Sequence, residues 1–264
     1  MSGQLAGAFE RAKRERRVAF IPYVMAGDPD LATTESILTA LTNAGADAIE
    51  LGIPYSDPLA DGPTIASAGA RALANETRLS NVLELVQRRR SETPLLLFTY
   101  FNPVYRFGIE GFAQQAARAG AAGAIVPDCA LEESETLRAA LQACGLEMPL
   151  LVAPSTTRER AARISDAATG FVYVVSRLGV TGAGKIPDFT PLREQLAVLR
   201  ELTDKPLAVG FGLSRASEVR EVAALADGVV VGSALIDAYT GFRGEEAAQR
   251  VSEFVTPLLA AARA

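Results

Sequence analysis

The stretch AGADAIELG (residues 44–52) passes from small residues typical of a helix end into a short apolar run. AGAAGAIVP (119–127) and ALADGVVVG (224–232) repeat this step further along the chain. A step that recurs in this way indicates a fold assembled from similar supersecondary units. The repeat therefore favours a regular alternation of helices and strands over the whole sequence.

Eight runs rich in β-branched or aliphatic residues predict eight strands, at residues 18–24, 47–53, 94–100, 122–127, 149–154, 171–176, 206–212 and 227–233. Segments with helical spacing of Ala, Leu and Val lie between most of them, among them 35–45, 81–90, 110–120, 134–145 and 216–226. Strands that alternate with helices form a parallel sheet. We expect a single closed (β/α)8 barrel, or TIM barrel, over residues 1–264 rather than an open doubly wound sheet. Extra helices are expected at 3–16 and at 245–262.

Composition excludes several classes of function. A net charge of −5 and a pI near 5.1 argue against a surface for nucleic acid or anionic membrane. No apolar run reaches the ~18 residues of a membrane span, and the first residues carry charges where a signal peptide is apolar. These features predict a soluble, cytoplasmic protein. Cys129 and Cys144 lack metal-ligand spacing, and a disulfide is not expected in the cytoplasm.

The chain contains no histidine. This excludes Ser-His-Asp and Cys-His catalysis and removes the commonest zinc ligand. Any chemistry must use carboxylates, lysine, tyrosine, hydroxyls or backbone amides.

Three carboxylates, Glu50, Asp57 and Asp61, crowd into ELGIPYSDPLADGPTI (50–65) at the end of the second predicted strand. Alternation along the strand turns Ile49 and Leu51 toward the helices and Glu50 into the barrel mouth. Burial there raises a carboxyl pKa toward the range useful for general acid or base catalysis. A structural alternative is a Glu50 satisfied by barrel hydroxyls or by an arginine.

Prolines and a glycine stiffen the loop after this strand, so that Asp61 can be held over the barrel mouth while Asp57 faces outward. Two carboxylates in different environments can share acid and base steps without histidine. The alternative is that both aspartates only make Asx turns.

Glycine-rich segments follow the later strands: GVTGAGK (179–185), GFGLS (210–214) and VGSAL (231–235). Their backbone amides can approach an anion closely, and phosphate sites recur beyond the last two strands of such barrels. The segments together predict a phosphorylated substrate. Tyr173, Phe211, Phe20 and Tyr100 are candidates for aromatic walls around a flat apolar group, or for core packing.

Several segments together resemble a known family: 50–65 with IPYVMAGDPD (21–30), VSRLGVTGA (175–183), GFGLS and VVGSAL (230–235). From about residue 5 to the C-terminus the sequence closely resembles the α subunit of tryptophan synthase. The resemblance implies a carbon-carbon lyase of tryptophan biosynthesis that cleaves indole-3-glycerol phosphate to indole and glyceraldehyde 3-phosphate. This retro-aldol reaction would need no metal or organic cofactor. Indole would pass to a pyridoxal-phosphate β subunit in an αββα heterotetramer.

The resemblance also implies residue roles. Glu50 would move protons at indole C3 and at the glycerol hydroxyl, and Asp61 would accept a hydrogen bond from the indole N–H. Tyr173 would lie beside the substrate, and Thr181 would help to orient Asp61. The phosphate would rest on the backbone of Gly182, Gly212, Gly232 and Ser233.

Asp57, with Asn102 and Pro103 in YFNP (100–103), would face the β subunit. Ala130 stands where many relatives have proline, which affects only the expected surface of that loop.

Two other functions remain open from the residues alone. The first is a Schiff-base aldolase that uses Lys185, one of three lysines, although this residue lies nine positions beyond Ser176 in a glycine-rich loop. The second is a protein that acts mainly as an allosteric partner subunit. A metal-dependent aldolase is disfavoured because no histidine is present.

Overall fold

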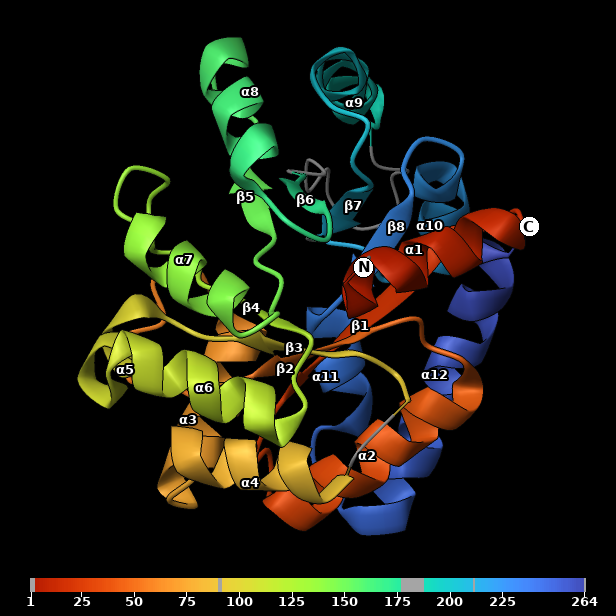
Figure 1. The fold of residues 1–264 in the computed structure, drawn as a ribbon. Helices are drawn as coiled ribbons and strands as arrows, with labels where there is room; N and C mark the ends of the chain where they lie inside the picture. The colour runs from red at the N-terminus through yellow and green to blue at the C-terminus, as the bar shows by residue number, and fades with distance from the viewer. Residues whose placement is uncertain (1–2, 90–91, 177–187, 211, 264) are drawn as a thin grey trace.

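The computed structural model describes residues 3–89, 92–176, 188–210 and 212–263 (Figure 1). Within these residues, eight parallel strands alternate with helices, as predicted. The strands are β1 Ala19–Met25, β2 Ile49–Gly52, β3 Leu95–Phe98, β4 Gly123–Ile125, β5 Leu150–Val152, β6 Val172–Val175, β7 Leu207–Gly210 and β8 Gly228–Val231. Each coincides with a predicted run, which confirms the eight strand positions.

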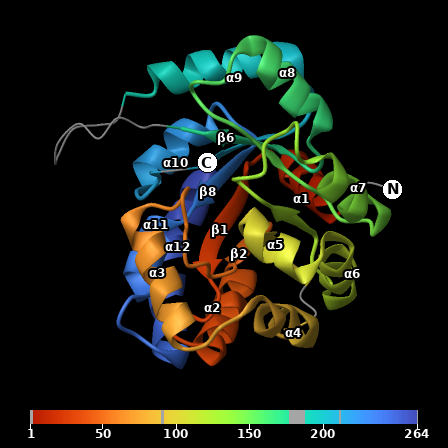
Figure 2. The ribbon, with the colours of Figure 1, turned by 90° about the vertical axis from the view of Figure 1, so that its left-hand side faces the viewer.

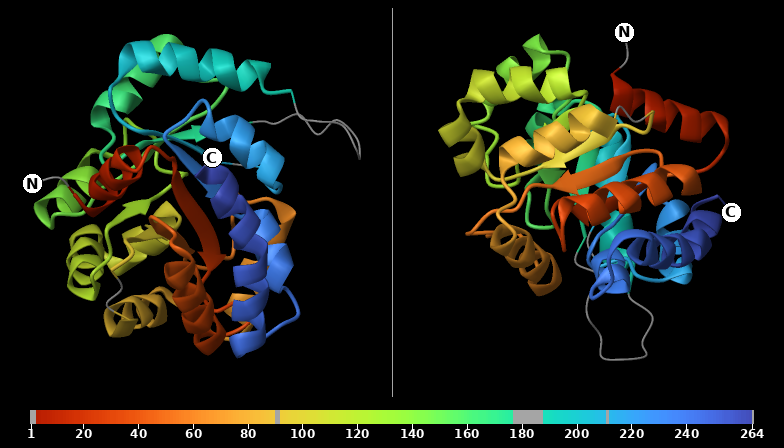
Figure 3. Two further views of the ribbon diagram at one scale, coloured as in Figure 1. Left: turned by 90° about the vertical axis from the view of Figure 1, so that its right-hand side faces the viewer. Right: turned by 90° about the horizontal axis from the view of Figure 1, so that it is seen from below.

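The helices surround the strands, as the views in Figure 2 and Figure 3 show. They are α1 Gln4–Arg14, α2 Leu31–Ala44, α3 Pro63–Ala74, α4 Leu79–Arg89, α5 Phe101–Phe107, α6 Ile109–Ala119, α7 Glu135–Ala143, α8 Arg158–Ala167, α9 Thr190–Leu202, α10 Ala216–Ala223, α11 Ser233–Tyr239 and α12 Gly244–Ala262. The two extra helices expected at the chain ends are α1 and α12. The segment YFNP leads from β3 into α5, and the helix tolerates Pro103 because this residue lies in the first turn, where no N–H is needed.

The sheet closes into a barrel. Its strand order is β4-β3-β2-β1-β8-β7-β6-β5. A parallel bridge between Gly123 and Glu147 joins the two ends, with the Ala124 N–H donating to the Glu147 carbonyl at 2.9 Å and the Glu147 N–H to the Ala122 carbonyl at 3.0 Å. The predicted (β/α)8 barrel is therefore confirmed.

Helix α1 lies across the N-terminal end of the barrel and is fixed there by Glu147. The carboxylate of Glu147 accepts hydrogen bonds from the backbone N–H groups of Leu5 at 2.7 Å and Ala6 at 3.2 Å. These donors have no partner inside the helix, so a distant side chain supplies the N-terminal cap. Phe9 of the same helix packs on Phe171 with a ring separation of 5.2 Å.

The repeated helix-to-strand step has a local cause. Gly45 and Gly120 end α2 and α6 in the left-handed region, with φ of 92° and 90°, where glycine carries no steric cost. Two aspartates of the repeat also play matching roles: Asp47 accepts the Phe20 N–H at 2.9 Å, and Asp227 accepts the Leu207 N–H at 2.7 Å. Each carboxylate also pairs with an arginine, so the repeat builds the same strand junction twice.

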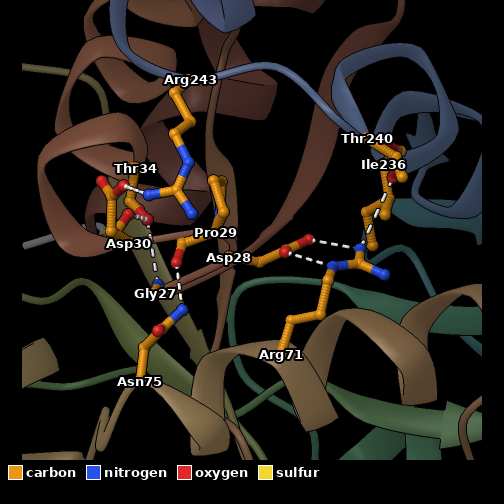
Figure 4. A network of polar contacts seen from close by, with 10 residues as sticks. All are labelled: Gly27, Asp28, Pro29, Asp30, Thr34, Arg71, Asn75, Ile236, Thr240 and Arg243. Carbon is orange, nitrogen blue, oxygen red and sulfur yellow. Dashed lines mark hydrogen bonds and ion pairs between the residues drawn. The ribbon is translucent and has the colours of Figure 1, made fainter.

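A network of polar contacts ties the start of α2 to α3 and to the end of α11 (Figure 4). The buried Asp28 accepts two hydrogen bonds from Arg71 of α3, at 2.7 and 2.8 Å, and Arg71 also reaches the Thr240 hydroxyl at 3.5 Å. The Asn75 side chain donates to the Pro29 carbonyl. Since α3 begins two residues after Asp61, this network anchors the helix into which the Asp61 loop leads.

Candidate active site

A cavity of about 260 Å³ lies among residues at the C-terminal strand ends and the loops that follow them. This is the end at which TIM barrels carry their active sites. Its lining consists of Tyr23, Glu50, Ala60, Asp61, Ile65, Phe98, Tyr173, Gly212, Leu213, Ser214, Val230, Gly232, Ser233, Ala234 and Asp237. Six of the residues singled out from the sequence are thus brought to one place: Glu50, Asp61, Tyr173, Gly212, Gly232 and Ser233.

Glu50 projects from β2 into this cavity. Its neighbours Ile49 and Leu51 are fully buried, and Glu50 itself is 1% exposed. Its Oε1 atom has no hydrogen-bond partner within the described part of the chain, so the expected alternative of a Glu satisfied by hydroxyls or an arginine finds no support there. Burial raises the pKa of Glu50 to about 8, so the carboxyl group is mainly protonated at neutral pH.

Asp61 occupies a different environment in the loop after β2. It is half-buried, and its Oδ1 atom accepts a hydrogen bond of 2.8 Å from the Tyr100 hydroxyl. The Ala60 N–H donates to the same hydroxyl at 3.1 Å, so two hydrogen bonds in series hold the Asp61 carboxylate in place. Burial raises the pKa of Asp61, and the bond from Tyr100 opposes that rise. The two carboxyl groups therefore lie in different environments, an arrangement suited to acid-base chemistry without histidine.

The aromatic residues that line the cavity are only partly those predicted from the sequence. Tyr100 supports Asp61 and is not among the lining residues of the cavity in the described structure. Phe20, predicted to contact substrate, does not line it either; the β1 residue that does is Tyr23. The two are three positions apart in one strand, so they point to opposite faces. Phe98 of β3, which sequence reasoning missed, also lines the cavity and meets the Tyr23 ring edge-on at 5.6 Å.

The glycine-rich end of the cavity is formed by the residues after β7 and β8. Gly212 has a φ of 87°, a conformation that a side chain would strain. Gly232 precedes α11, and Ser233 is its first residue. Thr181, Gly182 and Phe211, together with Lys185 of the alternative aldolase, lie outside the described residues.

The residues predicted to face a partner lie on one outer surface beside the cavity. Asp57 is exposed and accepts a hydrogen bond of 2.7 Å from the Ser56 hydroxyl. The Asn102 amide donates to the Tyr55 hydroxyl at 3.2 Å, which joins the loop after β2 to α5, and Pro103 is half-exposed on the same helix. Leu59 is 87% exposed on this surface. Ala130 is exposed and is not among the described residues that line the cavity.

Two further features concern possible cofactors and membranes. Among the described residues, no group of three or more acidic, cysteine or histidine side chains is placed to hold a metal ion. The described helices include none with the length and hydrophobicity to cross a bilayer.

The closed parallel barrel, with a cavity at its C-terminal end that the carboxyl groups of Glu50 and Asp61 line, is the architecture of a TIM-barrel enzyme. The family profile described as Tryptophan synthase alpha chain matches residues 9–263. The chain belongs to the tryptophan synthase alpha chain family, which confirms the resemblance seen in its sequence.

Individual relatives agree with this assignment. The tryptophan synthase alpha chain of Gloeobacter violaceus is 48% identical over 259 residues, which cover 97% of this chain and 94% of the relative. That of Geobacter sp. is 43% identical over 258 residues, with 97% and 96% coverage.

Solved structures show the same fold. A chain of tryptophan synthase from Mycobacterium tuberculosis has a TM-score of 0.91 and 36% identity, with both chains covered in full. The tryptophan synthase subunit alpha of Legionella pneumophila has a TM-score of 0.90 and 35% identity, over 99% of this chain and 98% of that one.

Proposed function

We propose that Glu50 and Asp61 carry out the reaction of this family in this chain. The activity is the retro-aldol cleavage of indole-3-glycerol phosphate to indole and glyceraldehyde 3-phosphate, a carbon-carbon lyase step of tryptophan biosynthesis. The observation that carries the residue assignment is the carboxyl group of Glu50, which is buried in the cavity with one oxygen unpartnered. A buried polar atom without a hydrogen bond costs free energy. Such an atom therefore indicates a place where a bound ligand supplies the missing hydrogen bond.

The raised pKa of Glu50 suits both proton transfers. The protonated carboxyl group donates its proton to indole C3, and the resulting carboxylate then accepts the proton of the hydroxyl on the adjacent glycerol carbon. As that proton leaves, the O–H electron pair forms the aldehyde carbonyl, the carbon-carbon bond breaks, and its electron pair returns to the ring as indole. Glu50 ends the cycle protonated, as it began.

Asp61 stabilises the intermediate state of the ring. Protonation at C3 places positive charge on the indole nitrogen, and a carboxylate that accepts the N–H bond lowers the energy of that state. Tyr100 holds Asp61 for this purpose through its 2.8 Å hydrogen bond. Fixed acceptors of this kind contribute several kcal/mol, so that losing one costs roughly 10²–10³-fold in rate.

The substrate phosphate is assigned to the glycine-rich end of the cavity. Gly212, Gly232 and Ser233 would supply backbone N–H groups there, with Gly182, and Tyr173 would pack beside the substrate. Thr181 would orient Asp61. The cleavage needs no cofactor in this proposal, because the two carboxylates supply both proton transfers.

The partner is a tryptophan synthase β subunit, in an αββα heterotetramer in which only the β subunit carries pyridoxal phosphate. Asp57, Asn102 and Pro103 would face it, and the exposed Leu59 on the same surface supports that contact. A cytoplasmic location is proposed, supported by the two free thiols Cys129 and Cys144.

The test is the release of indole from indole-3-glycerol phosphate by the wild-type protein and by Glu50→Gln, with the β subunit present. The variant should lose at least about 10²-fold in kcat while it still binds substrate. Glu147→Gln is the matched control, because Glu147 is a second buried glutamate but lies at the closure of the barrel beside α1, and its variant should keep the wild-type kcat. An active Glu50→Gln would refute the assignment of the proton transfers.

A further inference from the structure

Tyr23 lines the cavity and extends from its glycine-rich end toward the strand that carries Glu50. A side chain at Gly232 would begin 3.5 Å from the Tyr23 Cβ atom. A side chain at Gly52, two residues after Glu50, would overlap the Tyr23 hydroxyl. The parallel register also pairs Tyr23 with Glu50. The hydroxyl group therefore lies at the end of the cavity that holds the carboxylates, while the ring begins at the end that holds Gly232.

This hydroxyl is held firmly but has no protein partner among the described residues. Tyr23 is 4% exposed, and its ring is fixed by the edge-on contact with Phe98. None of the hydrogen bonds formed within the described structure involves the Tyr23 hydroxyl, whereas that of Tyr100 is paired with Asp61. A buried phenol aimed into a cavity without a partner is a group that a ligand can complete.

The Tyr23 hydroxyl is available as a donor at any physiological pH. Burial, together with the nearby charges of Asp61 and Glu50, holds the pKa of Tyr23 well above its usual value. The group stays a neutral phenol, so it donates one hydrogen bond and transfers no proton.

The chemistry of the substrate identifies the acceptor. At the carboxylate end, indole-3-glycerol phosphate presents the ring N–H and the hydroxyl on the carbon bonded to the ring. The N–H can only donate, and Asp61 accepts it. The hydroxyl oxygen remains as the acceptor at that end, and the phosphate oxygens lie at the other end, beside Gly232.

We propose that Tyr23 is a further catalytic residue, whose hydroxyl donates a hydrogen bond to the oxygen of the substrate hydroxyl that becomes the aldehyde. This inference rests on the proposed function. When the O–H proton passes to Glu50, this oxygen gains electron density until the carbon-carbon bond has broken. A donor placed on it stabilises that state more than the bound substrate, so its effect falls on kcat more than on KM.

The test is Tyr23→Phe, which removes one oxygen atom and keeps the ring against Phe98. Because the hydroxyl bonds to no described residue, the variant should fold with an unchanged melting temperature. Its kcat for indole-3-glycerol phosphate should fall about 10- to 100-fold, the usual effect of losing a hydrogen bond to a group that gains charge. Tyr239→Phe, a buried tyrosine outside the cavity lining, should keep the wild-type kcat.

A binding measurement separates hydrogen bonding from packing. The probe is 3-(indol-3-yl)propyl phosphate, which keeps the ring and the phosphate but lacks both glycerol hydroxyls. Tyr23→Phe should bind it within about 2-fold of wild type, because the acceptor is absent. An equal loss of probe affinity and of kcat would show a packing role and overturn the proposal, as would an unchanged kcat.

The two proposals fail in different ways. If Glu50→Gln is inactive and Tyr23→Phe is as active as wild type, only the role of Tyr23 is wrong. If Glu50→Gln keeps its activity, the proposed function itself is wrong, whatever Tyr23→Phe shows.

Discussion

Glu50→Gln should increase the stability of the protein at neutral pH although it removes activity. The Glu50 carboxyl group has an ordinary pKa of 4.5 and a folded-state pKa of about 8, raised by burial. Below pH 4.5 it is protonated in both states and costs nothing. As the pH rises from 4.5 to 8, the unfolded chain gains stability by ionising while the folded protein keeps the proton, so stability is lost across this window.

The size of the effect follows from the two pKa values. A difference of about 3.5 in pKa corresponds to about 5 kcal/mol once the pH exceeds both values. At pH 5 the loss is about 1 kcal/mol, at pH 7 about 3 kcal/mol and at pH 8 about 4 kcal/mol. Glutamine has nearly the same shape and no charge, so the variant escapes this loss. The stability difference between variant and wild type should therefore grow by about 3 kcal/mol between pH 5 and pH 8.

The assay is urea unfolding of both proteins at pH 4, 5, 6, 7 and 8, followed by circular dichroism, with the free energies of all resolved transitions summed. The difference at pH 4 supplies the baseline, because Glu50 is then mainly protonated in both states and the amide-for-carboxyl exchange dominates. A difference that stays constant from pH 5 to pH 8 would refute the reasoning, since Glu50 would then ionise equally in folded and unfolded protein.

Three further outcomes follow from the same structure. The cleavage rate at low substrate, kcat/KM, should fall about tenfold per pH unit above pH 8, because the first step needs protonated Glu50, and a rate that stays flat to pH 9.5 would exclude that role. Arg71→Gln should lower the free energy of unfolding by about 3 kcal/mol, because it leaves the buried Asp28 carboxylate unpaired; the double variant with Asp28→Asn should lose less than the sum of the two single variants. Glu147→Gln should cost about 1 kcal/mol and speed amide hydrogen exchange at the start of α1, and unchanged exchange there would mean that the cap is not what holds that helix.

Much of the fold follows from local pattern. The aliphatic runs located all eight strands, because a strand buried on both faces of a parallel barrel is apolar nearly throughout. Most predicted strand ends lie one or two residues beyond the observed ends, as for the run 206–212, in which β7 ends at Gly210. Apolar residues continue into the loops beyond a strand, so hydrophobicity alone does not mark the last paired residue.

The candidate site, too, could be predicted only in part from local sequence pattern. Alternation along β2 was enough to turn Glu50 inward, because neighbouring residues of a strand point to opposite faces. The same rule, applied to β1, would have favoured Tyr23 over Phe20 if the inward face of that strand had been known. Both residues are aromatic and both are buried, so the sequence contains no local signal to separate them.

The sequence by itself determined the order and type of the elements, the absence of histidine chemistry, and the presence of two carboxylates at the end of one strand. These depend on residue type and on spacing along the chain. Only the tertiary structure decided that Tyr100 holds Asp61, that Glu147 caps α1, and that the Tyr23 hydroxyl lies against Gly52 with no hydrogen-bond partner among the described residues. These contacts join residues that lie up to 142 positions apart in the chain. Their distances in space are set by the closure of the barrel, which no single segment of the sequence encodes.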